Sequence, residues 1–154
     1  MRDAEKTVFV SYRRSASRHL ARSIALDLRA HGYDVFFDVD TVDNGEFDQI
    51  VLHQIAVREH FVLVLSRGSL ERCADEGDWL RREIEAALEH KRNIVPIMES
   101  GFNFAGEAEY LSESLRDLPR FNGIPLYHFY FDAAMETLRK RFLKPREEEE
   151  THES

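Results

Sequence analysis

Cysteine is almost absent from this chain of 154 residues, which carries only Cys73. A single cysteine cannot form a disulfide within the chain, and such low usage is typical of a reducing compartment, so we expect a cytoplasmic protein. Residues 1–7 are rich in charge and resemble no secretory signal. Long hydrophobic runs are missing too, because stretches such as residues 61–65 are far too short to span a bilayer. We therefore expect no membrane partner.

An excess of positive charge is also lacking. The formal net charge is −8, and residues 146–154, with one arginine and five glutamates, contribute half of it. A protein that binds nucleic acid by neutralising phosphates needs the opposite balance, so we expect no nucleic-acid partner. The acidic stretch follows Pro145 and has few apolar side chains, which predicts a disordered tail after a single domain spanning residues 1–145.

Several catalytic motifs are missing from the places where they would have to stand. No glycine-rich phosphate-binding pattern follows the first apolar run, and no G-x-S-x-G motif marks a serine hydrolase. The seven histidines show no H-E-x-x-H spacing, and Cys73 has no cysteine partner, so no metal site is expected. A receiver domain would carry an acidic pair where this chain has Ser11, Tyr12 and Arg13.

The apolar residues that are present alternate between strand-like runs and helix-like spacing. Strand-like runs occupy residues 8–12, 33–38, 60–66, 93–98 and 124–130. Between and after them, helical spacing is carried by apolar residues within 20–28, 47–55, 78–88, 107–118 and 133–143, with a polar turn at 13–17. Five strands alternating with helices predict an α/β fold: a parallel sheet in the order 2-1-3-4-5 with helices on both faces.

In that strand order a ligand site lies beyond the carboxyl ends of strands one and three. The loop after residues 8–12 brings Tyr12, Arg13 and Arg14 to this point, and the loop after residues 60–66 brings Ser66. Arginine suits the recognition of phosphate, because its planar guanidinium donates several hydrogen bonds. The sequence therefore predicts an anion-binding crevice here.

The helix expected over residues 78–88 leads into the same crevice. Asp78 is placed to cap its first turn, and Trp79 and Glu83 are four residues apart on one face, at the border of the buried stripe. A carboxylate sheltered beside an indole resists ionisation more than a solvated one, so it suits a catalytic role. The alternative is a solvated glutamate beside a tryptophan that simply packs.

Taken together, these segments resemble the Toll/interleukin-1 receptor (TIR) domain family over about residues 6–143. The matching pieces are F-V-S-Y-R-R at 9–14, V-F-F-D at 35–38 with the loop to Gly45, F-V-L-V-L-S at 61–66, W-x-x-x-E at 79–83 and N-I-V-P-I at 93–97. The resemblance implies a flavodoxin-like TIR fold. It is nearest to the NAD⁺-cleaving branch of the family, which also has the F-N-G-I found at residues 121–124 and a cysteine like Cys73.

That resemblance implies an NAD⁺ glycohydrolase with NAD⁺ as substrate and no bound cofactor or metal. It makes Glu83 the catalytic residue and implies the following substrate-binding residues: Tyr12, Arg13, Arg14, Asp38, Asp43, Ser66 and Trp79. It also implies self-association, and contacts with other TIR proteins, through the family's BB loop, here containing Asp43, Asn44 and Gly45. The NAD⁺-cleaving branch has a lysine and a glutamate in this loop, where this chain has Thr41 and Asp43.

Two other functions remain open at this point. Many TIR domains are non-enzymatic adaptors in innate immune and cell-death signalling, and they act through TIR–TIR contacts alone. An inert module that binds NAD⁺ without cleaving it is the other alternative. Adaptors generally lack the combined tryptophan and glutamate, so the presence of Trp79 and Glu83 favours the enzyme.

Overall fold

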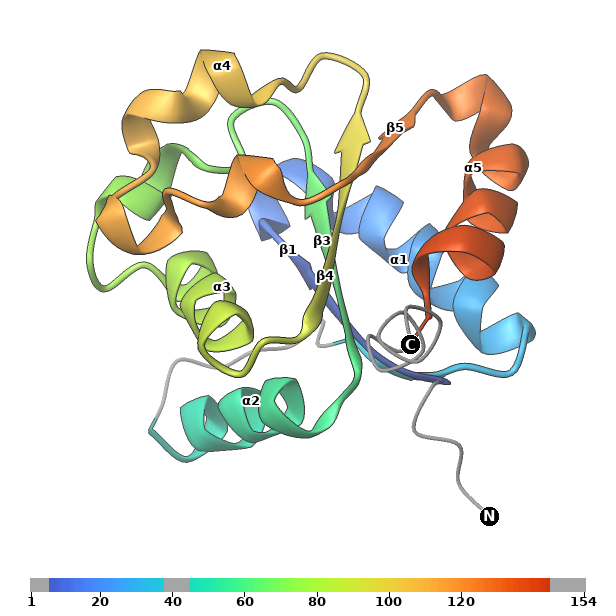
Figure 1. Ribbon diagram of the computed structural model, residues 1–154, viewed down its shortest axis with the longest axis horizontal. Helices are drawn as coiled ribbons and strands as arrows, with labels where there is room; N and C mark the ends of the chain where they lie inside the picture. The colour runs from blue at the N-terminus through green and yellow to red at the C-terminus, as the bar shows by residue number, and fades with distance from the viewer. Residues whose placement is uncertain (1–5, 38–44, 145–154) are drawn as a thin grey trace, which may run out of the picture.

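A five-stranded parallel sheet runs through the centre of the molecule, as predicted (Figure 1). The computed structural model describes residues 6–37 and 45–144. The strands follow one another across the sheet in the order β2-β1-β3-β4-β5. Their bounds are Thr7–Tyr12 (β1), Asp34–Phe36 (β2), His60–Leu65 (β3), Asn93–Glu99 (β4) and Ile124–Leu126 (β5).

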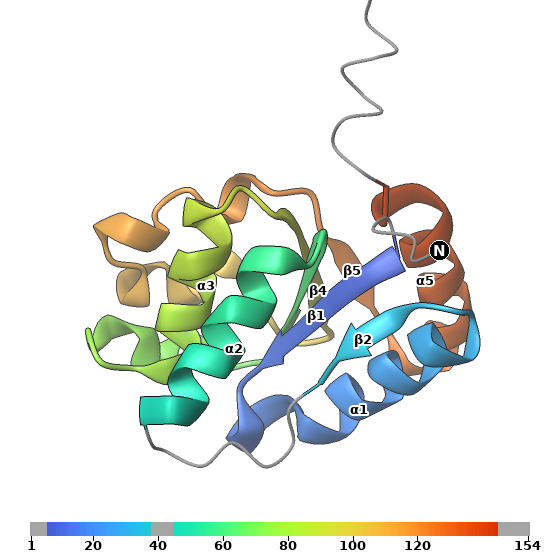
Figure 2. The same ribbon diagram turned by 90° about the horizontal axis from the view of Figure 1, so that it is seen from below.

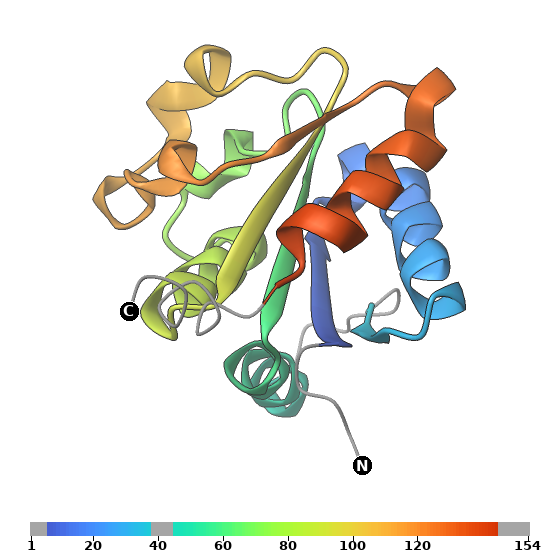
Figure 3. The same ribbon diagram turned by 45° about the vertical axis from the view of Figure 1, so that its right-hand side comes forward.

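Helices cover both faces of the sheet (Figures 1 and 2). One face carries α1 and α5, which Figure 3 shows side by side, and the other carries α2 and α3, which pack against each other. The bounds of these four helices are Arg14–Ala30 (α1), Gly45–Val57 (α2), Trp79–Glu89 (α3) and Phe131–Thr137 (α5). The sheet therefore separates two apolar cores.

The central strand β1 shows how the sequence builds both cores. Successive side chains of a strand point to opposite faces, so Val8 and Val10 join the core under α1 and α5. Phe9 points the other way, where its ring stacks on Phe36 and Phe61 at centroid distances of 5.3 and 5.6 Å. Ser11 shares the face of Phe9 and thus lies under α3.

The first helix confirms its predicted stripe but begins earlier than predicted. Leu20, Ile24 and Leu28 are buried, and Gly32 follows the helix with a φ of +89°, a conformation that favours glycine. The turn predicted at residues 13–17 is wrong, because Arg14 already begins α1. Only Ser17 within it has non-helical backbone angles (φ −132°, ψ 16°), and these leave a kink after the first turn.

The second helix also forms where expected, but its buried stripe is narrower. Val51 and Ile55 are fully buried, whereas 53% of Ile50 is exposed, so Ile50 faces away from the core. In the third helix Leu80, Ile84 and Ala87 are buried as predicted. Leu88, the fourth residue of that predicted stripe, is only partly buried, so the pattern placed both helices correctly and overestimated the burial of two side chains.

The helix predicted over residues 107–118 is wrong. Helix α4 (Phe104–Glu107) ends there, and three short 3₁₀ turns follow at Ala108–Tyr110, Glu113–Leu115 and Leu118–Arg120. Ser112 has extended backbone (φ −70°, ψ 175°), which no helix can continue through. Leu115 and Leu118 are nevertheless fully buried, so their spacing reports packing against the core and not a continuous helix.

The C-terminal part differs in length from the prediction. Strand β5 has three residues instead of the seven predicted, and a 3₁₀ turn at His128–Tyr130 follows it. Helix α5 then continues as a π-helical turn at Leu138–Phe142. Met135 and Leu138 are buried as predicted.

Proline at position 96 is tolerated inside β4 because the pairing of β4 with β5 begins one residue after it. The β4–β5 register starts at Ile97 paired with Ile124. The carbonyl of Pro96 faces Gly123, the residue before β5, at a point where a Cβ on Gly123 would lie 2.7 Å from that oxygen. Pro96 thus pairs with Leu63 of β3 on one side and precedes the first residue pair of the β4–β5 ladder on the other.

The acidic tail predicted for residues 146–154 lies outside the described residues. Within residues 6–37 and 45–144, no helix has the length and apolar character needed to cross a membrane.

Candidate active site

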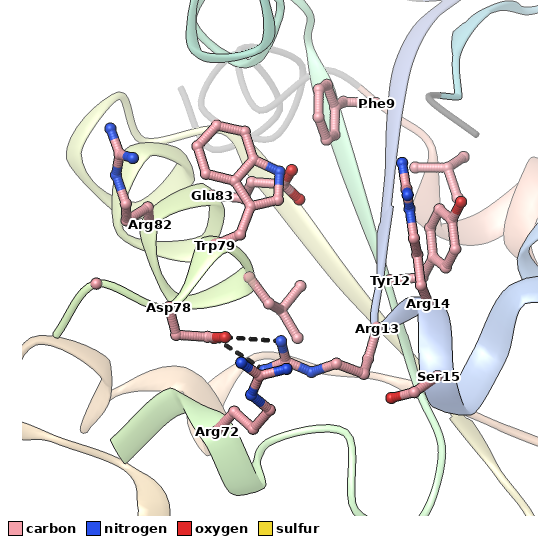
Figure 4. A pocket seen from close by; sticks show the side chains of 13 residues that line it. Phe9, Tyr12, Arg13, Arg14, Ser15, Arg72, Asp78, Trp79, Arg82 and Glu83 are labelled. Carbon is pink, nitrogen blue, oxygen red and sulfur yellow. Dashed lines mark hydrogen bonds and ion pairs between the residues drawn. The ribbon is translucent and has the colours of Figure 1, made fainter. Parts of the chain in front are cut away.

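A cleft of about 410 Å³ opens between the carboxyl end of β1 and the first turns of α3 (Figure 4). One wall carries Tyr12 and Arg14, and the other carries Trp79 and Glu83. The predicted crevice at the switch between β1 and β3 is therefore present, and it brings together residues about 70 positions apart in sequence.

Glu83 is buried in the wall of this cleft and is not a solvated helical carboxylate. Only 7% of the residue is exposed, and its Oε1 accepts a hydrogen bond of 2.6 Å from the hydroxyl of Ser11 on β1. We predicted a position at the border of the buried stripe, and the side chain in fact lies against the sheet. A buried carboxylate on a cleft can act on positive charge in a bound molecule.

Trp79 is partly buried beside Glu83, four residues earlier on α3. The guanidinium of Arg82 lies over its ring at 5.0 Å from the centroid, which helps to fix the indole. The indole Nε1 is buried, and it has no hydrogen-bond partner in the part of the chain that the structure describes. An apolar face and a fixed orientation suit this ring to enclosing a flat ligand.

Arg13 holds the start of α3 in place. Its guanidinium makes a two-pronged ion pair with Asp78 at 2.7 and 2.8 Å, and its Nε donates to the backbone oxygen of Ser69 at 3.0 Å. Asp78 in turn caps α3 by accepting the backbone N–H of Arg81, as predicted. The Arg13 side chain thus joins β1, the loop after β3 and the helix that carries Trp79 and Glu83.

This pairing shifts the pKa values of both partners. Burial alone would raise the pKa of Asp78, but the hydrogen bonds from Arg13 and Arg81 and the Arg13 charge outweigh burial and hold that pKa below 3.8. Burial alone would lower the pKa of Arg13, and the carboxylate of Asp78 reverses this and raises it. Both groups therefore stay charged at neutral pH.

Arg14 and Arg72 are the cations that remain available in the cleft. Both side chains line it and are exposed to solvent, and neither makes a hydrogen bond or ion pair with the residues described. Arg14 begins α1, whereas Arg72 lies in the 3₁₀ turn Glu71–Ala74 that precedes α3. Two guanidiniums on one cleft suit an anionic ligand.

Of the other predicted site residues that the structure describes, Tyr12 lies on the cleft and Ser66 does not. Tyr12 lines the cleft and stacks on Phe37 with the ring centroids 5.2 Å apart. Ser66 does not line it, since its hydroxyl is buried against Ser17 (2.7 Å) and Glu99 (2.6 Å). Asp38, Asp43 and Asn44 lie outside the described residues, and of Gly45 the structure records only that α2 begins there.

The sequence analysis missed Arg72 and Arg82, which line the cleft, and Ser11, which is buried behind Glu83. Strand alternation signals Ser11, because it lies two residues after Phe9 and so faces α3. Helical spacing signals Arg82, which is three residues after Trp79. Arg72 lies in a loop, and no sequence pattern indicated where it points.

The lone cysteine is not a reactive group. Cys73 is fully buried next to the Arg13–Asp78 pair, and burial, with the nearby charge of Asp78, raises the pKa of its thiol to about 12. Among the described residues, no three histidine, cysteine, aspartate or glutamate side chains gather into a group that could hold a metal ion.

Comparison with known proteins adds a family and several relatives. The sequence model described as TIR domain matches residues 8–137. The chain is 39% identical over 131 residues to the NAD(+) hydrolase tir-1 of Caenorhabditis elegans, covering 83% of this chain and 13% of that protein. It is 41% identical over 140 residues to the NAD(+) hydrolase sarm1 of Drosophila melanogaster, covering 89% and 10%.

A third relative, the NAD(+) hydrolase SARM1 of Danio rerio, is 35% identical over 141 residues, covering 89% of this chain and 19% of that protein. The chain therefore spans less than a fifth of the length of each of these relatives. Solved structures give the same fold at low identity. A metazoan TIR-STING receptor from C. gigas in complex with 2′,3′-cGAMP aligns with a TM-score of 0.60 and 20% identity, covering 91% of this chain and 41% of that one.

The TIR domains of the activated Roq1 resistosome, which directly recognises the pathogen effector XopQ, align with a TM-score of 0.62 and 16% identity. The alignment covers 88% of this chain and 98% of that one. At such identities the likeness supports the fold alone.

Proposed function

The chain belongs to the TIR domain family, and on that premise we propose that it is an NAD⁺ glycohydrolase. The observation that carries this proposal is the buried carboxylate of Glu83, held by Ser11 beside Trp79 on a cleft. The 35–41% identity to proteins named as NAD(+) hydrolases supports it. The names of these relatives give no support to the alternative of a non-enzymatic TIR adaptor.

The proposed reaction breaks the bond between nicotinamide and C1′ of the ribose. The bonding electron pair goes to the ring nitrogen, so the positively charged pyridinium leaves as neutral nicotinamide. The ribose becomes an oxocarbenium-like cation, and a carboxylate near C1′ stabilises that developing charge. Water then adds to C1′ and gives up a proton, and the product is ADP-ribose.

Five residues of the cleft have a part in this scheme. Glu83 stabilises the ribosyl cation, and Trp79 covers the nicotinamide end and excludes water. Arg14 and Arg72 bind the diphosphate, because they are the guanidiniums that no described residue engages. Arg13, which we predicted as a substrate ligand, acts instead by holding α3. NAD⁺ is the substrate in this scheme, and no further cofactor takes part.

The same cation allows a second product. If a base nitrogen of the same molecule attacks C1′ in place of water, the product is cyclic ADP-ribose, which makes the enzyme an ADP-ribosyl cyclase as well. Exclusion of water from the cleft decides between the two, since water and the base compete for one carbon.

We also propose that the domain works in the cytoplasm, in cell-death or innate immune signalling, and that it self-associates. The low cysteine usage supports the compartment. One structural neighbour consists of TIR domains in an activated resistosome, and the proposal extends such assembly to this chain. Contacts between copies of this chain, or with other TIR proteins, are the expected interaction.

The experiment that tests the function is direct. Purified protein at high concentration is incubated with NAD⁺, and nicotinamide release is followed by chromatography. We expect nicotinamide and ADP-ribose to appear in equal amounts, less any cyclic product. Binding of NAD⁺ without nicotinamide release would support the inert nucleotide-binding module instead.

A further inference from the structure

Ser11 is a hydroxyl in an otherwise apolar part of the sheet. It lies on the central strand β1, paired with Leu63 of β3, and only 1% of it is exposed. On the same face Phe9 packs against two other phenylalanine rings. A buried hydroxyl costs free energy unless it is hydrogen-bonded, so a serine here needs a partner.

The partner of Ser11 is the reacting carboxylate itself. The hydroxyl donates to Oε1 of Glu83 across 2.6 Å, between residues 72 positions apart in sequence. This length is typical of a hydrogen bond to a charged oxygen, which is stronger than a neutral one. Figure 4 shows the carboxylate beside the indole of Trp79, on the side toward β1.

Ser11 cannot itself meet a ligand, because it is buried and does not line the cleft. Its contact therefore acts on the orientation and charge of Glu83. We propose that Ser11 is the positioning residue that fixes the Glu83 carboxylate for the cleavage step, an inference that rests on the glycohydrolase function proposed above. The contact ties a side chain of α3 to a central strand of the sheet.

Two effects follow for Ser11→Ala. The carboxylate loses a donor that favours its charged form, so the acidic limb of the kcat profile moves up by about one pH unit. Loss of orientation lowers kcat at neutral pH about tenfold, and KM stays near the wild-type value because Ser11 does not touch the substrate. The other charged groups that line the cleft act alike on both proteins; they are Arg13, Arg14, Arg72, Asp78 and Arg82.

Ser17→Ala is the matched control. Ser17 is also buried (2% exposed), and it also donates or accepts a short hydroxyl bond, here with Ser66. If buried serines matter only for stability, both variants will lower the free energy of unfolding and neither will move the acidic limb. We expect the limb to move in Ser11→Ala alone. An unmoved limb and a wild-type kcat in Ser11→Ala would overturn the proposal.

A measurement without catalysis separates this inference from the proposed function. A ¹³C NMR titration of the Glu83 side-chain carboxyl gives the pH midpoint of its protonation. It can be measured in wild type and in Ser11→Ala whether or not NAD⁺ is cleaved. We expect a higher midpoint in the variant, and equal midpoints would overturn the Ser11 contact. Should alanine prevent folding, Ser11→Cys keeps the shape of the side chain with a slightly larger and weaker donor, and it must then show a shift in the same direction.

Discussion

Two neighbouring arginines have opposite surroundings at the cleft. Arg13 is 10% exposed and paired with a buried carboxylate, whereas Arg14 points into the cleft without a described partner. Breaking a buried pair costs about 3–5 kcal/mol, so Arg13→Ala will lower the free energy of unfolding by about that amount. Arg14→Ala will change it by less than about 0.5 kcal/mol.

The effects on NAD⁺ binding should have the opposite order, with Arg14→Ala affected and Arg13→Ala not. Arg14→Ala will raise KM for NAD⁺, because it removes a ligand of the diphosphate, while Arg13→Ala at a temperature where it is folded will keep a KM near wild type. Urea denaturation and steady-state kinetics on both variants test this. An Arg13→Ala protein as stable as wild type, or an Arg14→Ala protein with unchanged KM, would contradict the assignment.

The Arg13–Asp78 pair also predicts how stability depends on pH. The folded state holds the pKa of Asp78 below its ordinary value of 3.8, so the stabilisation is complete above that pH and is lost as the pH falls through the folded pKa. Asp78→Asn removes this contribution while keeping a helix cap. In urea denaturation the stability gap between wild type and Asp78→Asn should shrink below pH 3.8; a constant gap would mean that Asp78 is not ionically paired.

Among single residues, the sequence indicated the type of site better than its contacts. Trp79 and Glu83 were identified from helical spacing, and both lie on the cleft. The pairing of Arg13 with Asp78 was not foreseen, because a pattern cannot tell a guanidinium that faces a ligand from one that meets a carboxylate 65 residues later. The contacts of Ser66 were not foreseen for the same reason, since its partners Ser17 and Glu99 come from other elements.

At the junction of β4 and β5, Gly123 permits a close approach between two segments. A Cβ at this position would lie 2.7 Å from the backbone oxygen of Pro96 and 2.8 Å from the Met98 methyl. The methyl can move, but the backbone of a central strand cannot. Gly123→Ala should therefore lower the free energy of unfolding by about 1–3 kcal/mol, as overpacking does.

The control for Gly123 is Gly77, where an added Cβ would have open space around it and no positive φ applies. Thermal or urea denaturation compares the two alanine variants. Equal stability of both would show that β5 can shift away from Pro96 without cost.

Elements with strict periodicity were predictable, and those shaped by distant contacts were not. The apolar stripes of α1 and α3 were predictable from the sequence, because each repeats over three turns and has a cap or a glycine at one end. The region from Ala108 to Arg120 fails because its buried leucines, spaced for a helix, are reached through separate 3₁₀ turns. Strand β5 begins where predicted but ends at Leu126, opposite Glu99, the last residue of β4.

The proposal of self-association makes a prediction about the whole molecule. The proposal expects the BB loop, residues 39–45, to complete the site of a neighbouring copy. Weak interfaces dissociate on dilution by mass action, so specific activity should fall over about a hundredfold dilution. Gly45→Pro should lower activity without unfolding the protein. Constant specific activity, with an active Gly45→Pro, would favour a self-sufficient monomer.

The most direct test of the account is the turnover of NAD⁺ by Glu83→Gln. Glutamine keeps the size of the side chain and its hydrogen bond with Ser11, but removes the charge that stabilises the ribosyl cation. Unfolding curves should match those of wild type within about 1 kcal/mol, as for a volume-conserving change. We predict a loss of nicotinamide release of at least about a hundredfold. Release at near the wild-type rate by folded Glu83→Gln would contradict the central role of this carboxylate.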